Sequence, residues 1–227
     1  MIGILGSQEE EISLLRQQLE GRIDLERGPY IIHKGVLRGK NVLLALSGNG
    51  KVNAAAMCQL IISEGAKKII FTGVAGGLLK KQKFGDMVIA TDTVQHDMDV
   101  TALGYHLGEI PGDGLAFESD KELLDLAFEA AKKLEHVQVS KGRVLTGDKF
   151  INSEEESRFL RETFEAACVE MEGAAVGQIA TKWKIPFVII RSLSDTAGSD
   201  SHMDFKEFID LAAKNAKIIV LDMLEAI

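Results

Sequence analysis

Short, largely apolar runs recur along the chain, at residues 2–5, 42–46, 68–71, 87–90 and 187–190. Strands with one face in water alternate polar and apolar residues, whereas runs like these are expected of strands with both faces covered. Both faces of a sheet are covered when helices pack on each side of it. The pattern therefore predicts an α/β fold with a largely parallel or mixed central sheet.

Helix signals lie between the apolar runs. Ser119 and Ser153 each precede a glutamate by three residues, which is the pattern of a capping box at the start of a helix. Near the C-terminus, one apolar stripe repeats at helical spacing. The stripe consists of Phe205, Phe208, Ile209, Ala212, Ala216, Ile219, Val220, Met223 and Ile227. We expect this helix to pack against the sheet with the stripe in the core.

Loops rich in small residues follow several of the predicted strands, at residues 6–9, 47–50, 72–77 and 194–198. Small residues let a ligand approach the backbone, and open α/β sheets bind ligands at the carboxyl ends of their strands. Four such loops predict one shared pocket. For any single loop, the alternative is that its glycines only make a tight turn.

The composition is that of a globular protein, and its net charge argues against some classes of binding partner. Of the 227 residues, 46% are hydrophobic and 26% are charged, and no Pro, Gly or Ser-rich linker interrupts them, so we expect a single domain over residues 1–227. The net charge of −8 argues against nucleic acid or an anionic membrane as partner, because both repel an acidic surface.

The cysteines and the first residues indicate a cytoplasmic protein. Cys58 and Cys168 each lie in an apolar stretch, which is typical of small buried residues rather than of a disulfide framework or a metal site. The apolar segment at residues 1–6 is too short for a signal peptide and leads directly to three glutamates. No apolar run approaches the roughly 20 residues that span a bilayer.

Familiar nucleotide and hydrolase motifs are absent. The first turn has Glu9 where the pyrophosphate of a dinucleotide needs a positive field, and residues 48–53 lack the third glycine of that motif. Lys51 follows a glycine as in a phosphate-binding loop, but Ala45 and Val52 replace the first glycine and the hydroxyl residue of that loop. Neither G-x-S-x-G nor H-E-x-x-H occurs. Nucleoside triphosphates are therefore not expected as ligands.

A metal site is also not expected. His96, Asp97 and Asp99 could supply ligands, yet no second cluster at a recognisable spacing completes a coordination shell. Loop residues of this kind are usually solvated. The five histidines show no spacing typical of a catalytic triad.

Carboxylates carry the clearest chemical signal. Residues 9–11 are three glutamates after the first strand, where they either favour the positive end of a helix or form part of a site. Glu170 and Glu172 lie among apolar and small residues, where burial would raise their pKa values unless donors compensate; the alternative is a solvated turn. Alternation along the strand places Arg191 and Asp195 on one side, at a site or in a surface ion pair.

Six segments, in order along nearly the whole chain, resemble those of the 5′-methylthioadenosine/S-adenosylhomocysteine nucleosidases, members of the larger nucleoside phosphorylase group. The segments are residues 3–11, 47–52, 72–77, 147–152, 169–172 and 191–195. The resemblance implies a three-layer α/β/α sandwich that forms a homodimer. It also implies hydrolysis of the bond between adenine N9 and ribose C1′, in methionine salvage, without metal or cofactor.

The resemblance assigns roles to the charged residues. Adenine leaves poorly as an anion, so an acid must protonate its N7 while water attacks a ribosyl group of oxocarbenium character. Asp195 corresponds to that acid, with Ser194 orienting it. Glu11 corresponds to the base that activates water, and Arg191 to a group that positions it. Glu172 corresponds to the residue that binds the ribose 2′- and 3′-hydroxyls.

The resemblance also implies the contacts to the rest of the nucleoside. Phe150 would stack on adenine, the Ile151 backbone would bind its edge, and Met171 would lie against the sugar. The remaining expected substrate-binding residues are Val74, Ala75, Gly76, Gln8, Asn49, Phe205, Leu103 and Pro111, the last two in a segment that reaches the neighbouring subunit's site.

The 5′ region departs from the family pattern. Gln8 and Asn49 stand where many relatives have apolar residues, Val74 where some have serine, and Leu103 where some have phenylalanine. We infer a more polar 5′ pocket. Candidate substrates are 5′-methylthioadenosine and S-adenosylhomocysteine, together with 5′-deoxyadenosine and 6-amino-6-deoxyfutalosine.

Two other functions compete with this prediction. A nucleoside phosphorylase of the same fold would use phosphate in place of water, but it needs arginines where Glu11 and its neighbours stand. A non-catalytic nucleoside-binding module would need only the pocket glycines and Phe150.

Overall fold

The computed structural model describes residues 1–135, 137–196 and 205–227, and of residues 195, 196 and 205–207 it describes the backbone alone. Each predicted apolar run lies in a strand of one mixed sheet, so the α/β prediction is confirmed. These strands are β1 (Ile2–Gly6), β4 (Lys40–Leu46), β5 (Lys68–Gly77), β6 (Met87–Gln95) and β10 (Phe187–Thr196).

Five strands of the described chain were not predicted by apolar runs. They are β2 (Glu20–Arg27), β3 (Tyr30–Leu37), β7 (Phe117–Glu118), β8 (Val139–Thr146) and β9 (Cys168–Glu170). Strands β2 and β3 form an antiparallel hairpin that extends the sheet beyond β4. At the other side, β5, β10, β6, β8 and β9 pair in turn and β9 pairs back with β5, so these strands close a ring.

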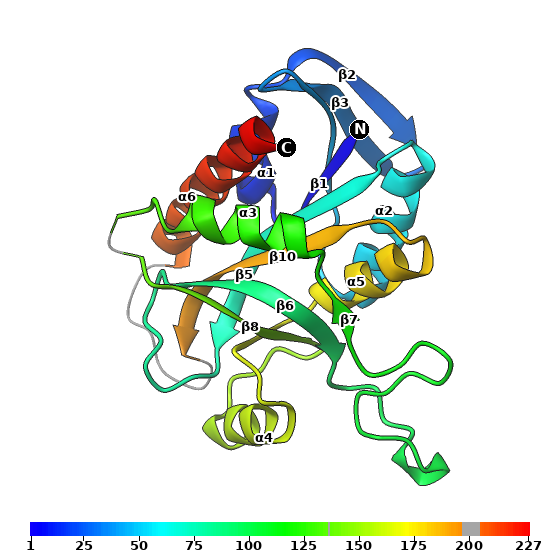
Figure 1. The fold of residues 1–227 in the computed structure, drawn as a ribbon, viewed down its shortest axis with the longest axis vertical. Helices are drawn as coiled ribbons and strands as arrows, with labels where there is room; N and C mark the ends of the chain where they lie inside the picture. The colour runs from blue at the N-terminus through cyan, green and yellow to red at the C-terminus, as the bar shows by residue number, and fades with distance from the viewer. Residues whose placement is uncertain (136, 197–204) are drawn as a thin grey trace.

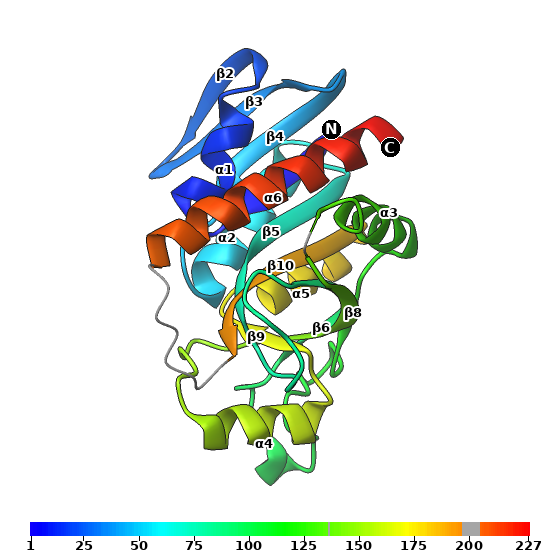
Figure 2. The same ribbon diagram turned by 90° about the vertical axis from the view of Figure 1, so that its left-hand side faces the viewer.

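Helices cover both faces of the sheet, as Figures 1 and 2 show. On one face lie α1 (Glu9–Arg16), α3 (Lys121–Ala131) and α6 (Phe205–Ala226), and their apolar residues join the core that Ile4 and Ile190 line. On the other face lie α2 (Lys51–Ser63) and α5 (Gly173–Lys182), which pack on Phe71 and Ile189. Helix α4 (Glu154–Phe164) covers the ring of strands at one end of the molecule. The expected three layers are therefore present.

The predicted helix signals are largely correct. Ser153 caps α4, its hydroxyl accepting a hydrogen bond from the backbone N–H of Glu156. The expected cap at Ser119 is wrong by one residue, because the Asp120 carboxylate accepts from Leu123 N and starts α3. In α6, the predicted stripe from Phe208 to Met223 is buried, whereas the side chain of Phe205 lies outside the described residues.

The parallel strands β4, β1, β5 and β10 bring their carboxyl ends to one edge of the sheet. Gly6 is aligned with Leu46 on one neighbour and with Thr72 on the other, and Arg191 is aligned with Gly73. The loops at residues 6–9 and 47–50 therefore start at this edge, as predicted, whereas residues 72–77 form the last part of β5 itself and residues 197–198 of the fourth predicted loop lie outside the described residues. No helix of the described chain is long and apolar enough to cross a bilayer.

Candidate active site

Glu11 lies in the first turn of α1, directly under the loop that leaves β1, and its side chain is buried. Its Oε2 accepts hydrogen bonds from the backbone N–H groups of Ser7 at 2.6 Å and Gln8 at 2.9 Å, and from the Ser7 hydroxyl at 3.2 Å. None of the described residues forms a hydrogen bond with its buried Oε1. Burial raises the pKa of Glu11, against the lowering effects of the Gln8 N–H and the Arg191 charge. One oxygen is thus fixed and the other is free to accept a proton.

Glu172 lies at the amino end of α5 and is also buried, so the solvated-turn alternative is wrong. Its Oε1 accepts a hydrogen bond from the backbone N–H of Gly50 at 2.8 Å. Burial and the neighbouring Glu170 raise the pKa of Glu172 to about 7. The loops after β4 and β9 therefore meet at this carboxylate.

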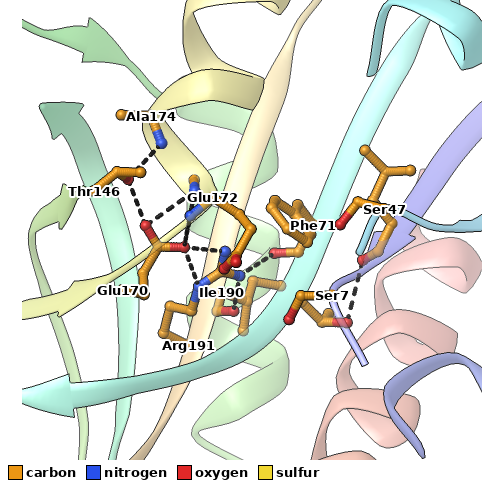
Figure 3. A network of polar contacts seen from close by, with 12 residues as sticks. Ser7, Ser47, Phe71, Thr146, Glu170, Glu172, Ala174, Ile190 and Arg191 are labelled. Carbon is orange, nitrogen blue, oxygen red and sulfur yellow. Dashed lines mark hydrogen bonds and ion pairs between the residues drawn. The ribbon is translucent and has the colours of Figure 1, made fainter. Parts of the chain in front are cut away.

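Glu170 lies at the centre of the site, and its role was not predicted from the sequence. Its carboxylate accepts hydrogen bonds from Gly173 N at 2.8 and 2.9 Å and from Glu172 N at 3.2 Å, which satisfies the first N–H groups of α5. It also accepts the Thr146 hydroxyl proton and pairs with Arg191. Figure 3 shows Glu170 between Thr146 and Arg191. The available signal was its position two residues before Glu172 in an apolar stretch.

Arg191 is fully buried in β10 and binds Glu170 through two nitrogens, Nε at 3.0 Å and Nη2 at 2.5 Å from Oε2. Nη1 donates to the backbone carbonyl of Ile190 at 3.1 Å, and the guanidinium lies over the ring of Phe71 at 4.3 Å. Gly73 makes room for it, because a Cβ there would lie 2.9 Å from Nη1. A surface ion pair is therefore excluded for Arg191, which is a fixed internal cation.

Asp195 lies at the end of β10, with its backbone aligned with Gly76, and its side chain lies outside the described residues. The pairing of β10 with β5 shifts register between Leu193 and Asp195. A bulge breaks the alternation of side chains, so the regular alternation that puts Leu193 on the side of Arg191 ends before Asp195. Ser194, at the bulge, contacts the Ala75 carbonyl through its hydroxyl at 3.4 Å.

Most of the residues expected to bind adenine and the sugar lie together. Gly76, Phe150, Ile151, Met171 and Ser194 line one small cavity beside Glu170. The Phe150 side chain is 72% exposed, whereas Ile151 is buried. An exposed ring next to a cavity has a free face for stacking on a base. Ala75 is buried in β5, and Val74 packs against the α6 residues Phe208 and Ile209.

The residues expected near the 5′ group divide into two sets. Gln8 and Asn49 are in contact, with Gln8 Nε2 donating to Asn49 Oδ1 at 2.8 Å. Leu103 and Pro111 are exposed on the segment around the short helix η1 (Thr101–Leu103), which projects from the ring of strands (Figure 1). The structure therefore does not bring Leu103 and Pro111 to the carboxylates of their own chain.

The acidic segment at residues 96–99 forms internal bonds rather than a ligand shell. Asp97 pairs with Lys51, and Asp99 accepts hydrogen bonds from Thr101. Among the described residues, no group of three or more histidines, cysteines or acids has the geometry to hold a metal.

Comparisons with known proteins agree with this geometry. Residues 1–225 match the family model described as Phosphorylase superfamily. A 5′-methylthioadenosine/S-adenosylhomocysteine nucleosidase of Geobacillus sp. (strain WCH70) is 40% identical over 228 residues, which cover 100% of this chain and 98% of the relative.

Solved structures give the same result. The Neisseria meningitidis nucleosidase of that name, in complex with methylthio-immucillin-A, has a TM-score of 0.94 at 41% identity and covers 100% of this chain and 99% of its own. The native futalosine hydrolase of Helicobacter pylori strain 26695 has a TM-score of 0.92 at 35% identity, with coverage of 100% and 97%. The full-length matches show that this chain belongs to the 5′-methylthioadenosine/S-adenosylhomocysteine nucleosidases of the phosphorylase superfamily.

Proposed function

We propose that this protein hydrolyses the N-glycosidic bond of 5′-substituted adenine nucleosides, releasing adenine and the 5-substituted ribose. The relatives named above carry this activity in their names. The observation that carries the proposal is the buried Oε1 of Glu11, which has no partner among the described residues and lies beside an internal arginine and a second carboxylate. Water placed on Oε1 would lose its proton to a carboxylate whose pKa burial has raised, which makes it a stronger base.

The charge of the site favours water over phosphate as the nucleophile. Glu11, Glu170 and Glu172 are buried together with a single buried arginine in the described chain, and Arg191 already binds Glu170. A phosphate dianion in this place would face uncompensated negative charge. The phosphorylase alternative is therefore less well supported.

The remaining roles follow the resemblance. Glu172 accepts hydrogen bonds from the ribose hydroxyls, with Met171 against the sugar and Phe150 and Ile151 on adenine. Asp195 protonates adenine N7, with Ser194 orienting it. The cavity shared by Phe150, Met171 and Ser194 supports this order of adenine and sugar along the edge of the sheet.

The 5′ group is a methylthio or homocysteinyl substituent in this proposal. The hydrogen bond between Gln8 and Asn49 gives this side of the site a polar wall, which supports acceptance of polar groups. The similarity to a futalosine hydrolase keeps 6-amino-6-deoxyfutalosine among the candidates. Measuring kcat/KM for 5′-methylthioadenosine, S-adenosylhomocysteine and aminodeoxyfutalosine side by side ranks them.

Product analysis tests the proposed reaction. We expect adenine and the free 5-substituted ribose in equal amounts, whether or not phosphate is present. A ribose 1-phosphate product that forms only with phosphate would establish a phosphorylase. For a binding module, Asp195→Asn would leave adenine release at the same background level as in the parent, whereas a hydrolase would lose about 10²-fold or more.

We also propose a homodimer in the cytoplasm. The exposed apolar side chains of Val52 on α2 and of Leu103 and Tyr105 beyond β6 support a second copy as partner. Cys58 and Cys168 are buried free thiols, as expected of a reducing compartment. Sedimentation over a range of concentrations measures the assembly.

A further inference from the structure

Asp97 bonds to two segments that carry opposite sides of the proposed site. Its Oδ1 accepts from Lys51 Nζ at 2.7 Å, and its Oδ2 accepts from the backbone N–H of Asp148 at 2.9 Å. The Asp148 carboxylate in turn accepts from the backbone N–H of Lys51 at 2.8 Å. The end of β6, the start of α2 and the loop after β8 are thus tied in one closed set of bonds.

These bonds continue into the site on both sides. Gly50 precedes Lys51 and donates its N–H to Glu172, the proposed ribose-binding residue. Gly50 has φ of +86°, and a Cβ there would lie 3.1 Å from Asp148 Oδ1, so the two loops are in close contact. Phe150, the proposed adenine-stacking residue, follows Asp148 by two positions.

The placement of charge explains why the bonds form here. Lys51 is the first residue of α2, where the positive end of the helix disfavours a cation. The carboxylates of Asp97 and Asp148 supply the negative charge and the acceptor that this helix end needs. The Phe150 side chain is largely exposed whereas Ile151 is buried. Packing therefore holds the end of the loop at Ile151, and the polar bonds of Asp148 hold the part that precedes Phe150.

We propose that Asp97 is a positioning residue that holds the adenine-binding loop, residues 147–151, at a fixed distance from Glu172, so that base and ribose are bound in one geometry. The proposal rests on the proposed nucleosidase function. A purely structural role would lower stability without affecting adenine affinity.

Adenine affinity is the direct measurement, because it needs no turnover. In Asp97→Ala, both the Asp148 N–H and the Lys51 ammonium lose their acceptor, and we expect the calorimetric Kd for adenine to rise about tenfold, as for a lost charge-assisted hydrogen bond. Asp97→Asn keeps one carbonyl acceptor, and we expect it to recover part of that loss. If Asp97→Ala does not fold, the test is the Kd for adenine of Asp97→Asn, which should be higher than that of the parent.

The pH profile of kcat/KM is the second measurement. The charged groups that face Glu172 are Glu170 of β9, Arg191 of β10 and Glu11 of α1. From the α2 side, the Gly50 N–H donates a hydrogen bond to Glu172. That N–H lowers the pKa of Glu172. If Asp97→Ala displaces Gly50, the acid limb of kcat/KM moves to higher pH.

Asp125→Ala is the matched control. Asp125 also bridges two cations from different elements, Lys121 of α3 and Lys141 of β8, at 2.6 and 2.7 Å. We expect Asp125→Ala to lower Tm, as Asp97→Ala does, but to leave the Kd for adenine and the pH profile of kcat/KM unchanged. Unchanged adenine Kd in Asp97→Ala, or an equal rise in Asp125→Ala, overturns the positioning role. Failure of the parent protein to release adenine from nucleosides would instead overturn the proposed function.

Discussion

The two carboxylate oxygens of Glu11 have different surroundings: one bonds to the backbone at the start of α1, and the other is available to the water that would react. Oε2 accepts the N–H groups of Ser7 and Gln8, which directly precede α1, and Oε1 has no partner within the described part of the chain. The sequence left two alternatives for Glu11, a role at the helix end and a role in the site. The structure shows that one side chain can have both. The same bonds hold the carboxylate in place, so no reorganisation is needed before it accepts a proton.

Glu11→Gln keeps the shape of the side chain and an oxygen for the Ser7 and Gln8 N–H groups, but it removes the proton acceptor. We expect kcat for adenine release to fall about 10²-fold or more, with a small change in KM. Glu10→Gln is the control, because Glu10 is the exposed neighbour on the same helix turn. Turnover near that of the parent in Glu11→Gln removes Glu11 from the mechanism.

Glu172→Gln is expected to stabilise the protein at neutral pH while damaging activity. Burial and Glu170 raise the pKa of Glu172 from 4.5 to about 7 in the folded state. Because its pKa is raised, Glu172 keeps its proton to higher pH in the folded protein than in the unfolded chain. The free energy of unfolding is therefore higher at low pH, and it falls between about pH 4.5 and 7 as Glu172 ionises. Gln resembles the protonated form and still accepts from Gly50. At pH 8 the free energy of unfolding should rise by up to about 3 kcal/mol.

Thermal unfolding of Glu172→Gln and the parent at pH 5 and pH 8 checks this sign. The gain in Tm should be large at pH 8 and much smaller at pH 5. Glu10→Gln, which changes an exposed carboxyl, should show little difference at either pH. A Tm for Glu172→Gln below that of the parent at pH 8 contradicts the prediction.

At the scale of elements, the amino end of α5 is held by side chains from two strands. Thr146 of β8 accepts the Ala174 N–H at 2.7 Å and donates to Glu170 of β9. Thr146→Val keeps the shape but leaves the buried Ala174 N–H without its partner and removes one of the two hydrogen bonds to Glu170 Oε1, where the bond from Gly173 N remains. We expect it to lower the free energy of unfolding by about 1–3 kcal/mol.

Thr93→Val is the matched control for this substitution. Thr93 lies on β6, is as fully buried as Thr146, and its hydroxyl has no partner in the described chain. Removing an unpaired hydroxyl should be neutral or stabilising. Denaturant unfolding of both variants measures the difference, and equal destabilisation would show that shape rather than hydrogen bonding matters here.

The elements also show what sequence could and could not predict. Runs such as residues 187–190 were recognised because strands covered on both faces carry no polar side. Strand β2 was missed because nearly all of its side chains are exposed, and it forms only by pairing with β3. In the site, Glu11 and Arg191 could be named from motifs. The pairing of Arg191 with Glu170, and the bulge before Asp195, depend on contacts between distant strands.

At the scale of the whole molecule, the proposed dimer makes a prediction that separates it from a monomer with a complete site. Leu103 is exposed and lies apart from the carboxylates of its own chain. If it completes the neighbouring subunit's 5′ pocket, Leu103→Asp should impair the site of the other protomer. Glu11→Gln instead impairs the site of its own protomer.

Mixing these two variants should restore activity that neither has alone. In a mixed dimer, the Leu103→Asp protomer keeps its own Glu11 and receives Leu103 from its partner, so one of the two sites is intact. Random exchange of subunits makes half of the dimers mixed, and the mixture should therefore reach about a quarter of the parental activity per site. Adenine release measured before and after subunit exchange tests this. Glu10→Gln mixed with Glu11→Gln is the control, because its activity should stay at the mean of its two components, about half of the parental activity, before and after exchange. Activity of the test mixture that stays at the mean of its two components shows that each chain builds its site alone.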